Sequence, residues 1–95
     1  MMNQVVVIGR ITKNEKNIMT LAVQRAIKNS EGIYETDFIP CQLSKGIAEN
    51  VCEYCQKGDL VGVKGKLETN EEKALQVVAD RVTFLSSKKE NDNFW

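Results

Sequence analysis

The sequence predicts an all-β fold with one helix, arranged as a five-stranded Greek-key barrel. Five segments carry the alternating or β-branched pattern of strands, and one segment carries the apolar spacing of a helix. The helical segment falls between the third and fourth strand segments. A length of 95 residues suits a single domain with a small core, to which oligomerisation would add stability.

The first strand is expected over residues 4–12, which are β-branched and apolar. Gly9 interrupts this run, so a bulge, a sharp bend or a close backbone approach is expected there. Residues 13–17 are polar and are interpreted as the turn that ends the strand.

Two further strands are expected over residues 18–27 and 34–43, joined by an Asn-Ser-Glu-Gly turn. Pro40 cannot donate to a ladder and is expected at an edge or a bulge. Alternation divides the second of these strands into two faces. The apolar face, interpreted as core, carries Ile39, Cys41 and Leu43. The opposite, largely polar face carries Tyr34, Thr36, Phe38, Pro40, Gln42 and Ser44.

A helix is expected over residues 44–56, with Ser44 as its N-cap and Gly58 just past its end. Four apolar residues at positions i, i+4, i+7 and i+8 form one stripe along it. They are Ile47, Val51, Tyr54 and Cys55.

The fourth strand, residues 59–69, alternates again, and a polar turn over residues 70–73 leads to the last strand, residues 74–85. One face of the fourth strand carries Val61, Val63 and Leu67, and the other carries Lys64, Lys66 and Glu68. The resulting order β-β-β-α-β-β describes an OB-fold, a small barrel with the helix between strands three and four. We assign the OB-fold to residues 1–87 and a short polar and aromatic tail to residues 88–95.

Charge and hydropathy limit the classes of function. Lysine and arginine together number 13, as do aspartate and glutamate, so the net charge is zero. A nucleic-acid-binding domain is usually basic, so attraction for phosphate must come from a local patch. The N-terminal segment does not have the pattern of a signal peptide, and no stretch approaches the ~20 apolar residues of a membrane span. A cytoplasmic, nucleoid-associated location is therefore expected, in which cysteines remain thiols.

The cysteines are interpreted as small residues of the helix face and the core. Cys52 and Cys55 form a C-x-x-C pair, a spacing found in redox and zinc sites, but they fall late in the expected helix. Zinc needs four ligands, whereas Cys41 is the one other cysteine and histidine is absent. Neither a metal nor a cofactor is expected. Enzyme activity is not expected either, because there is no histidine base and no phosphate-binding glycine loop.

Two aromatic residues on a polar strand face, with basic residues nearby, indicate a surface for single-stranded nucleic acid. Stacking a base on an aromatic ring contributes ~1–3 kcal/mol whatever the sequence. Phe38 is the leading candidate, and Tyr34 lies on the same face. The alternative for Phe38 is cover by the helix, a loop or another subunit. The candidate phosphate contacts are Arg10, Lys13, Arg25, Lys28, Lys64 and Lys66, for each of which an ordinary solvated surface is the alternative.

Five segments, in the family's order over most of residues 2–89, resemble the bacterial single-stranded DNA-binding proteins. They are MNQVVVIGRIT, TLAVQR, KNSEGIYETDFIPC, IAENVCEYCQKGDLVGVKGKL and VVADRVTFLSSKK. The resemblance implies sequence-tolerant binding of single-stranded DNA in replication, recombination or repair. It also implies a homo-oligomer, a tetramer built from dimers, while the short loops of this chain leave a dimer as the alternative.

The chain departs from that family in its hairpins and its aromatic residues. The hairpins before Met19 and before Leu75 are shorter than in the family. Phe38 keeps one stacking position. Alignment places Ile27, Ser44 and Glu72 where the family has other aromatics. This economy resembles the primosomal accessory protein, so a protein-interaction module with weak DNA binding is the alternative function.

The first strand is the expected subunit contact, through Asn3, Val5 and Val7, because so long an apolar edge would otherwise invite aggregation. In the tail, Phe94 and Trp95 follow two acidic residues. Family members commonly end in an acidic stretch with an aromatic tip that docks on replication and repair proteins. The tail is therefore expected either to dock on such partners or to pack its aromatics on the barrel or on a neighbouring subunit.

Overall fold

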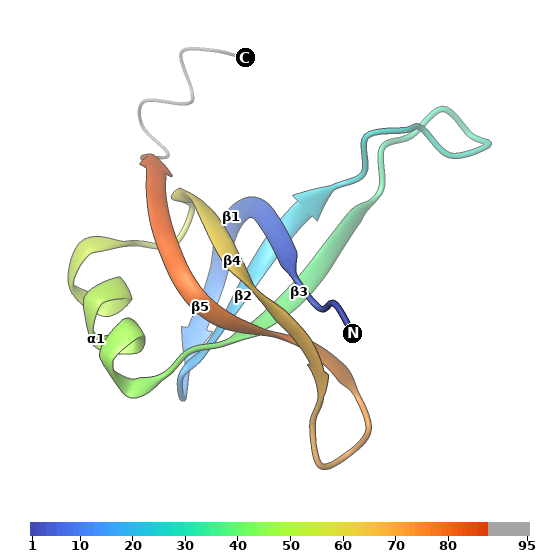
Figure 1. Ribbon diagram of the computed structural model, residues 1–95. Helices are drawn as coiled ribbons and strands as arrows, with labels where there is room; N and C mark the ends of the chain where they lie inside the picture. The colour runs from blue at the N-terminus through green and yellow to red at the C-terminus, as the bar shows by residue number, and fades with distance from the viewer. Residues whose placement is uncertain (88–95) are drawn as a thin grey trace.

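Within residues 1–87, five strands close into a barrel in the order β1-β2-β3-β5-β4, and one helix follows β3 in the chain (Figure 1). The computed structural model describes residues 1–87. The elements are β1 Val5–Glu15, β2 Ile18–Gln24, β3 Thr36–Gln42, α1 Lys45–Tyr54, β4 Leu60–Thr69 and β5 Leu75–Ser86. The expected five-stranded barrel with its helix between the third and fourth strands is confirmed.

Strand β1 continues through Glu15, so the expectation of a turn over residues 13–17 was wrong. The connection to β2 is a two-residue hairpin, in which Lys16 and Asn17 both have positive φ, 52° and 64°. Two positive φ values are typical of the type I′ turn, whose twist matches that of paired strands. Residues 13–15 are polar because they lie exposed near the end of the hairpin, not because the chain turns there.

Strands β2 and β3 are shorter than expected, and residues 25–35 form a hairpin loop that projects from the barrel (Figure 1). Ile27 and Tyr34, which we expected at strand ends, therefore lie in this loop. Asn29 organises its tip, because its side-chain oxygen accepts hydrogen bonds from the backbone N–H groups of Glu31 and Ile33, at 2.9 and 3.0 Å. These local bonds compete with continuation of the strand ladder.

The helix begins as expected, with the backbone N–H of Ile47 donating to the Ser44 hydroxyl at 3.4 Å. It ends earlier than expected, at Tyr54. Gly58 lies in the turn to β4 with φ of 96°, not directly after the helix, and its N–H donates to the carbonyl of Ile11 at 2.7 Å. Tyr54, which we placed in the apolar stripe, is 69% exposed, whereas Val51 is buried in the core and Ile47 and Cys55 pack against it.

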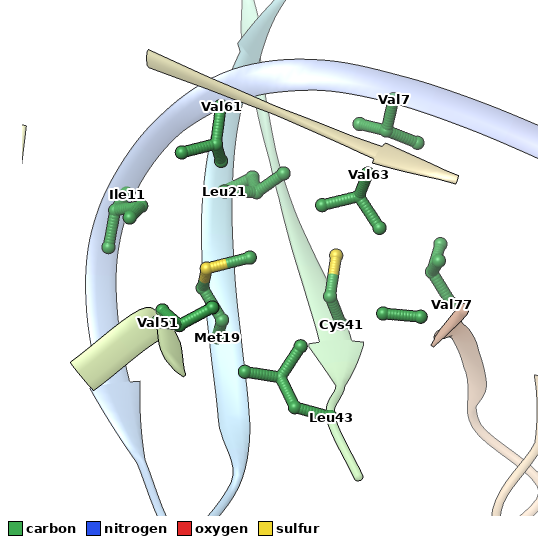
Figure 2. Packing of buried hydrophobic residues seen from close by; sticks show 11 residues of the cluster. Val7, Ile11, Met19, Leu21, Cys41, Leu43, Val51, Val61, Val63 and Val77 are labelled. Atoms are coloured by element: carbon green, nitrogen blue, oxygen red, sulfur yellow. The ribbon is translucent and has the colours of Figure 1, made fainter. Parts of the chain in front are cut away.

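The core fills the barrel and is closed at one end by α1 through Val51 (Figure 2). Its buried members are Val7, Ile11, Met19, Leu21, Cys41, Leu43, Val51, Val61, Val63, Val77 and Ala79. Leu67, which alternation grouped with Val61 and Val63, is 41% exposed. It lies near the end of β4, where the β4–β5 hairpin extends away from the barrel (Figure 1).

Gly9 marks a close backbone approach, one of the three possibilities expected there. A β-carbon at Gly9 would lie 2.7 Å from the carbonyl oxygen of Ala22. Pro40 lies on β3, whose second edge pairs with β5 only at Cys41 and Gln42. Pro40 stands just outside this short pairing, at an open part of the edge, as expected. Within residues 1–87, the helix is neither long nor apolar enough to cross a membrane.

Candidate nucleic-acid interface

The outer face of β1, β2 and β3 brings predicted residues from different strands into one row. Arg10 of β1 is paired with Ala22 of β2, and Ala22 is paired with Phe38 of β3. Paired residues of neighbouring antiparallel strands point to the same side of a sheet. Arg10 and Phe38 therefore project from the same face, separated by a single strand. We call these three residues the Phe38 row.

Phe38 is open to solvent, since 64% of its surface is exposed. Neither the helix nor a loop of residues 1–87 covers its ring, as one alternative had required. Its neighbour in the row, Ala22, contributes a single methyl group and does not shield the ring. The face of the ring is therefore available to a flat partner.

Tyr34 and Lys28 come together in the hairpin loop beyond Phe38. The Lys28 Nζ lies 5.4 Å from the centroid of the Tyr34 ring, a cation–π contact, and Tyr34 is 45% exposed. Tyr34 precedes β3, in the part of the loop that leads toward Phe38. An aromatic ring and a cation that both face solvent can serve a base and a phosphate side by side.

Arg10 and Lys13 are the cations that share the outer face with Phe38. Arg10 is half-buried, and its Nη1 donates to the carbonyl of Gly58 at 3.1 Å, which ties the guanidinium to the turn before β4, on the edge of β1 away from β2. Lys13 pairs with Thr20 of β2, and Thr20 pairs with Pro40 of β3. Lys13 therefore lies in the row of paired residues next to the Phe38 row. Its Nζ lies 3.7 Å from a Glu15 carboxylate oxygen, and both side chains are largely exposed.

Arg25, also expected to hold phosphate, lies on the other face of the hairpin. Its Nε and Nη2 donate to the two carboxylate oxygens of Asp37 at 2.9 and 3.0 Å. Its Nη1 lies 3.7 Å from Glu35. Hydrogen bonding and charge from Asp37 raise the pKa of Arg25, and the hydrogen bonds from Arg25 lower the pKa of Asp37. Asp37 is opposite Val23, which packs on the core, so this group is separated from the aromatic face.

Lys64 and Lys66 project from β4 and are not brought to the Phe38 row. Lys64 is paired with Val6 of β1 and with Arg81 of β5. The Nζ of Lys66 lies 3.7 Å from the Glu68 carboxylate. The two lysines therefore belong to the β1–β4–β5 side of the barrel.

Ala22 is the member of the row that the sequence did not reveal. A small residue in an amphipathic strand carries no signal of its own, and only the register between β2 and β3 places it beside Phe38.

The turn of the hairpin between β4 and β5 carries Glu71 and Glu72, whose negative charges repel phosphate.

The residues expected at a subunit contact are placed differently from one another. Val7 is 9% exposed and lies in the core, and Val5 is half-buried against it. The Asn3 amide is tied to the backbone of Leu67, donating to its carbonyl and accepting from its N–H, at 2.8 and 2.9 Å. Val6 points outward on the same strand and is 66% exposed. At the start of β1, Val5 and Val7 therefore face the core and Val6 faces outward, the reverse of the arrangement expected for a subunit contact.

Two of the three cysteines have a raised pKa. Burial raises the pKa of Cys41 to about 11. Burial, with a smaller contribution from the charge of Asp59, also raises the pKa of Cys55, while Cys52 is exposed. Among residues 1–87, no group of three or more metal-ligating side chains is gathered in one place. Phe94 and Trp95, the expected docking tip, lie outside the described residues.

A family model described as the single-strand binding protein family matches residues 2–85. The chain is 41% identical over 106 residues to single-stranded DNA-binding protein B of Bacillus subtilis (strain 168), covering 93% of this chain and 94% of that protein. It is 40% identical over 108 residues to single-stranded DNA-binding protein 1 of Clostridium acetobutylicum, covering 94% and 98%.

Two solved structures share the fold. The small single-stranded DNA-binding protein from Streptomyces coelicolor superposes with a TM-score of 0.67 at 18% identity, covering 90% of this chain and 96% of that one. The mitochondrial single-stranded DNA-binding protein Rim1 from S. cerevisiae gives a TM-score of 0.66 at 18% identity, covering 92% and 97%. Both likenesses support the assignment of the barrel as an OB-fold.

Proposed function

The chain belongs to the single-strand binding protein family, and from that premise we propose that it binds single-stranded DNA on the Phe38 row without catalysing a reaction. The observation that carries the proposal is the uncovered ring of Phe38, 64% exposed on the same sheet face as Arg10. Binding by stacking is tolerant of sequence, because every base has a π-face.

In the proposed mode, one base stacks on Phe38 and a second stacks on Tyr34, while Arg10, Lys13 and Lys28 attract the phosphates between and beside them. Phe38 and Tyr34 are four residues apart along the chain, which is at most ~13 Å at the rise of ~3.3 Å per residue of extended backbone. That span accommodates a few nucleotides of an extended single strand. Lys64 and Lys66, on the other side of the barrel, are proposed as contacts only for DNA that continues past β1.

The electrostatic part of the binding is expected to be modest. The chain carries no net charge, and Lys13 and Lys66 each lie 3.7 Å from a carboxylate of their own strand. Because each phosphate contact adds about 0.7 to the salt slope for single strands, the slope for this protein is expected to be small. Stacking then supplies a larger share of the affinity than in a basic protein.

Fluorescence anisotropy of a labelled oligo-dT of about 30 nucleotides tests the proposal, and Phe38→Ala is expected to weaken binding by ~1–3 kcal/mol. Tyr54→Ala is the matched control, because Tyr54 is 69% exposed but lies on α1. Equal affinities for wild type and Phe38→Ala would contradict stacking on this ring. If wild type fails to bind even at low salt, the chain acts instead as a protein-interaction module on the same fold.

We also propose that the chain forms a homo-oligomer, a dimer or a tetramer, through the outer face of β1 and β5. Val6, Ile8 and Leu85 are 66%, 54% and 46% exposed there. Gly62 lies on β4, the strand between β1 and β5. A β-carbon at Gly62 would lie 3.9 Å from Ile8 and 3.7 Å from Leu85, so these two side chains approach each other over the glycine. Ile8→Lys is expected to reduce the mass measured by light scattering, whereas Glu53→Lys on α1 is expected to leave it unchanged.

The cellular setting is proposed from the family: replication, recombination or repair in the cytoplasm, with protein partners recruited by Phe94 and Trp95. Removal of these two residues is expected to reduce recovery of replication and repair proteins in a pull-down while DNA binding persists. Unchanged recovery would remove the tail from the proposal.

A further inference from the structure

We propose that Arg25 is a positioning residue, which holds the β2–β3 hairpin in shape for DNA and does not itself bind a phosphate. Arg25, Asp37 and Glu35 are together called the Arg25 clamp. The inference rests on the proposed function, because the hairpin carries Tyr34 and leads directly into Phe38.

All three nitrogen atoms of the Arg25 guanidinium are already engaged. Two donate to Asp37 in the parallel, two-bond geometry that is the strongest for an arginine–carboxylate pair. The third lies 3.7 Å from Glu35. Exposed ion pairs usually contribute little, but paired bonds within a network are the exception. One positive charge therefore faces two negative charges, so the clamp does not attract a phosphate.

The clamp bridges the two strands where the hairpin leaves the barrel. Arg25 follows the end of β2, and Asp37 is the second residue of β3. The backbone N–H of Arg25 donates to the carbonyl of Glu35 at 2.8 Å, one pair beyond the ladder. The clamp thus extends the pairing of β2 and β3 with side-chain bonds beyond the last residue of β2.

The same network reaches the tip of the loop. The Asn29 side-chain amide donates to a Glu35 carboxylate oxygen at 3.2 Å. Asn29 in turn holds the turn, accepting from the N–H groups of Glu31 and Ile33. A continuous path of bonds therefore runs from Asp37 through Arg25 and Glu35 to the turn. It lies on the face opposite Phe38, so it can order the hairpin without occupying the stacking surface.

A hairpin that is ordered before DNA arrives loses less conformational entropy on binding, which is the general advantage of preorganisation. Loss of the clamp is expected to lower affinity without removing a phosphate contact. Neutralising Asp37 distinguishes this role from a phosphate contact. The affinity for DNA is expected to fall if Arg25 positions the hairpin and to rise if Arg25 binds a phosphate.

The test titrates labelled oligo-dT with wild type, Asp37→Asn, Arg25→Gln and Arg25→Lys at several salt concentrations. If the clamp positions the hairpin, Asp37→Asn weakens binding by about two- to fivefold, the range of a well-formed exposed ion pair. Arg25→Lys weakens it as much as Arg25→Gln does, because a lysine keeps the charge but not the two-bond geometry. The salt slope stays unchanged in all three variants.

If Arg25 instead bound a phosphate, Asp37→Asn would release it and tighten binding. Arg25→Lys would bind nearly as well as wild type, and Arg25→Gln would lower the salt slope by about 0.7. Glu53→Gln and Lys45→Gln on α1 are the controls, since they change the net charge by the same amounts away from the hairpin. Tighter binding by Asp37→Asn than by Glu53→Gln overturns the inference.

Amide hydrogen exchange of the free protein provides a readout that needs no DNA. Arg25→Gln and Asp37→Asn are expected to speed exchange at Glu31 and Ile33 by about threefold or more, because local opening becomes easier. Exchange at Glu72 and Ala74, in the other long hairpin, is the internal control and is expected to stay the same. Unchanged exchange at Glu31 and Ile33 overturns the inference. If wild type and Phe38→Ala both fail to bind oligo-dT, the proposed function fails instead, and the exchange result still decides the clamp.

Discussion

Asn29 and Asn70 organise two separate hairpins with the same set of hydrogen bonds. Each side-chain oxygen accepts from the backbone N–H groups two and four residues later, at 2.9 and 3.0 Å in both loops. Each backbone N–H also donates to the carbonyl four residues later, at 2.9 Å in both. The residue three positions on has positive φ in both, 78° at Gly32 and 67° at Lys73. The two long hairpins are thus closed by one turn design built from different residues.

The shared turn predicts that Asn70→Ala destabilises the fold. Two backbone N–H groups, of Glu72 and Ala74, lose their acceptor, and the expected loss is about 0.5–1.5 kcal/mol in urea unfolding. Asn70→Asp keeps an acceptor oxygen at the same place and is expected to lose less. Equal stability of Asn70→Ala and wild type would contradict a structural role for this side chain.

Lys73 occupies the position that Gly32 holds in the other hairpin, and its φ of 67° is unfavourable for a residue with a β-carbon. Lys73→Gly is therefore expected to raise the free energy of unfolding by about 0.5–1 kcal/mol, the strain relieved less the greater entropy of glycine in the unfolded chain. The reciprocal change, Gly32→Ala, is expected to lower it by about 1–2 kcal/mol. The strain argument fails if both changes shift stability in the same direction.

Gly65 is predicted to tolerate no side chain. A β-carbon there would press into the backbone carbonyl of Val78, at a register shift between β4 and β5. Gly65→Ala is expected to cost about 3 kcal/mol or more, beyond ordinary overpacking, because backbone atoms must move. Gly46 is the control, since a β-carbon there meets nothing within 4 Å in α1, and Gly46→Ala is expected to stabilise by about 0.5–1 kcal/mol.

Cys41 gives the fold a dependence on alkaline pH. Burial raises its pKa from 9.0 to about 11, so the folded state keeps the proton that the unfolded state releases. The stabilising contribution is complete below pH 9.0 and is lost as the pH rises toward 11. Stability measured across this window is expected to fall more steeply for wild type than for Cys41→Ala. Parallel pH profiles for the two proteins would contradict the buried neutral thiol.

The three thiols are also predicted to react in order of exposure. At pH 8, Cys52 is expected to react first with a thiol reagent and Cys55 more slowly, while Cys41 is slower than Cys52 by about a hundredfold or more until the protein unfolds. Mass spectrometry of partly labelled protein gives the order. Early labelling of Cys41 would mean that the barrel opens readily.

Several features of the site were predictable because they depend on neighbours in the chain. Alternation within one strand put Phe38 and Cys41 on opposite faces of the sheet. The structure places Phe38 on the outside of the barrel and Cys41 in the core. Alternation gave no such guide for the start of β1. Val5, Val6, Val7 and Ile8 are all apolar, so either phase has the same pattern, and only contact with β4 and the core determines that Val7 turns inward.

The role of Arg25 was beyond the sequence for a different reason. Its position near a predicted stacking strand suggested a phosphate contact, but its partner Asp37 lies 12 positions away along the chain. The pairing depends on the register of β2 against β3, which brings Val23 opposite Asp37 and sets Arg25 diagonally beside it. No spacing within either strand predicts that register.

The sequence by itself determined the element order, the N-cap at Ser44 and the outward face of Phe38, because each follows from local periodicity and backbone chemistry. Only the tertiary structure decided the Phe38 row and the Arg25 clamp. These features depend on which residues stand opposite one another and on where each ladder ends. Register and ladder ends are set by the closure of the whole barrel, in which every strand must satisfy the neighbours on both of its edges.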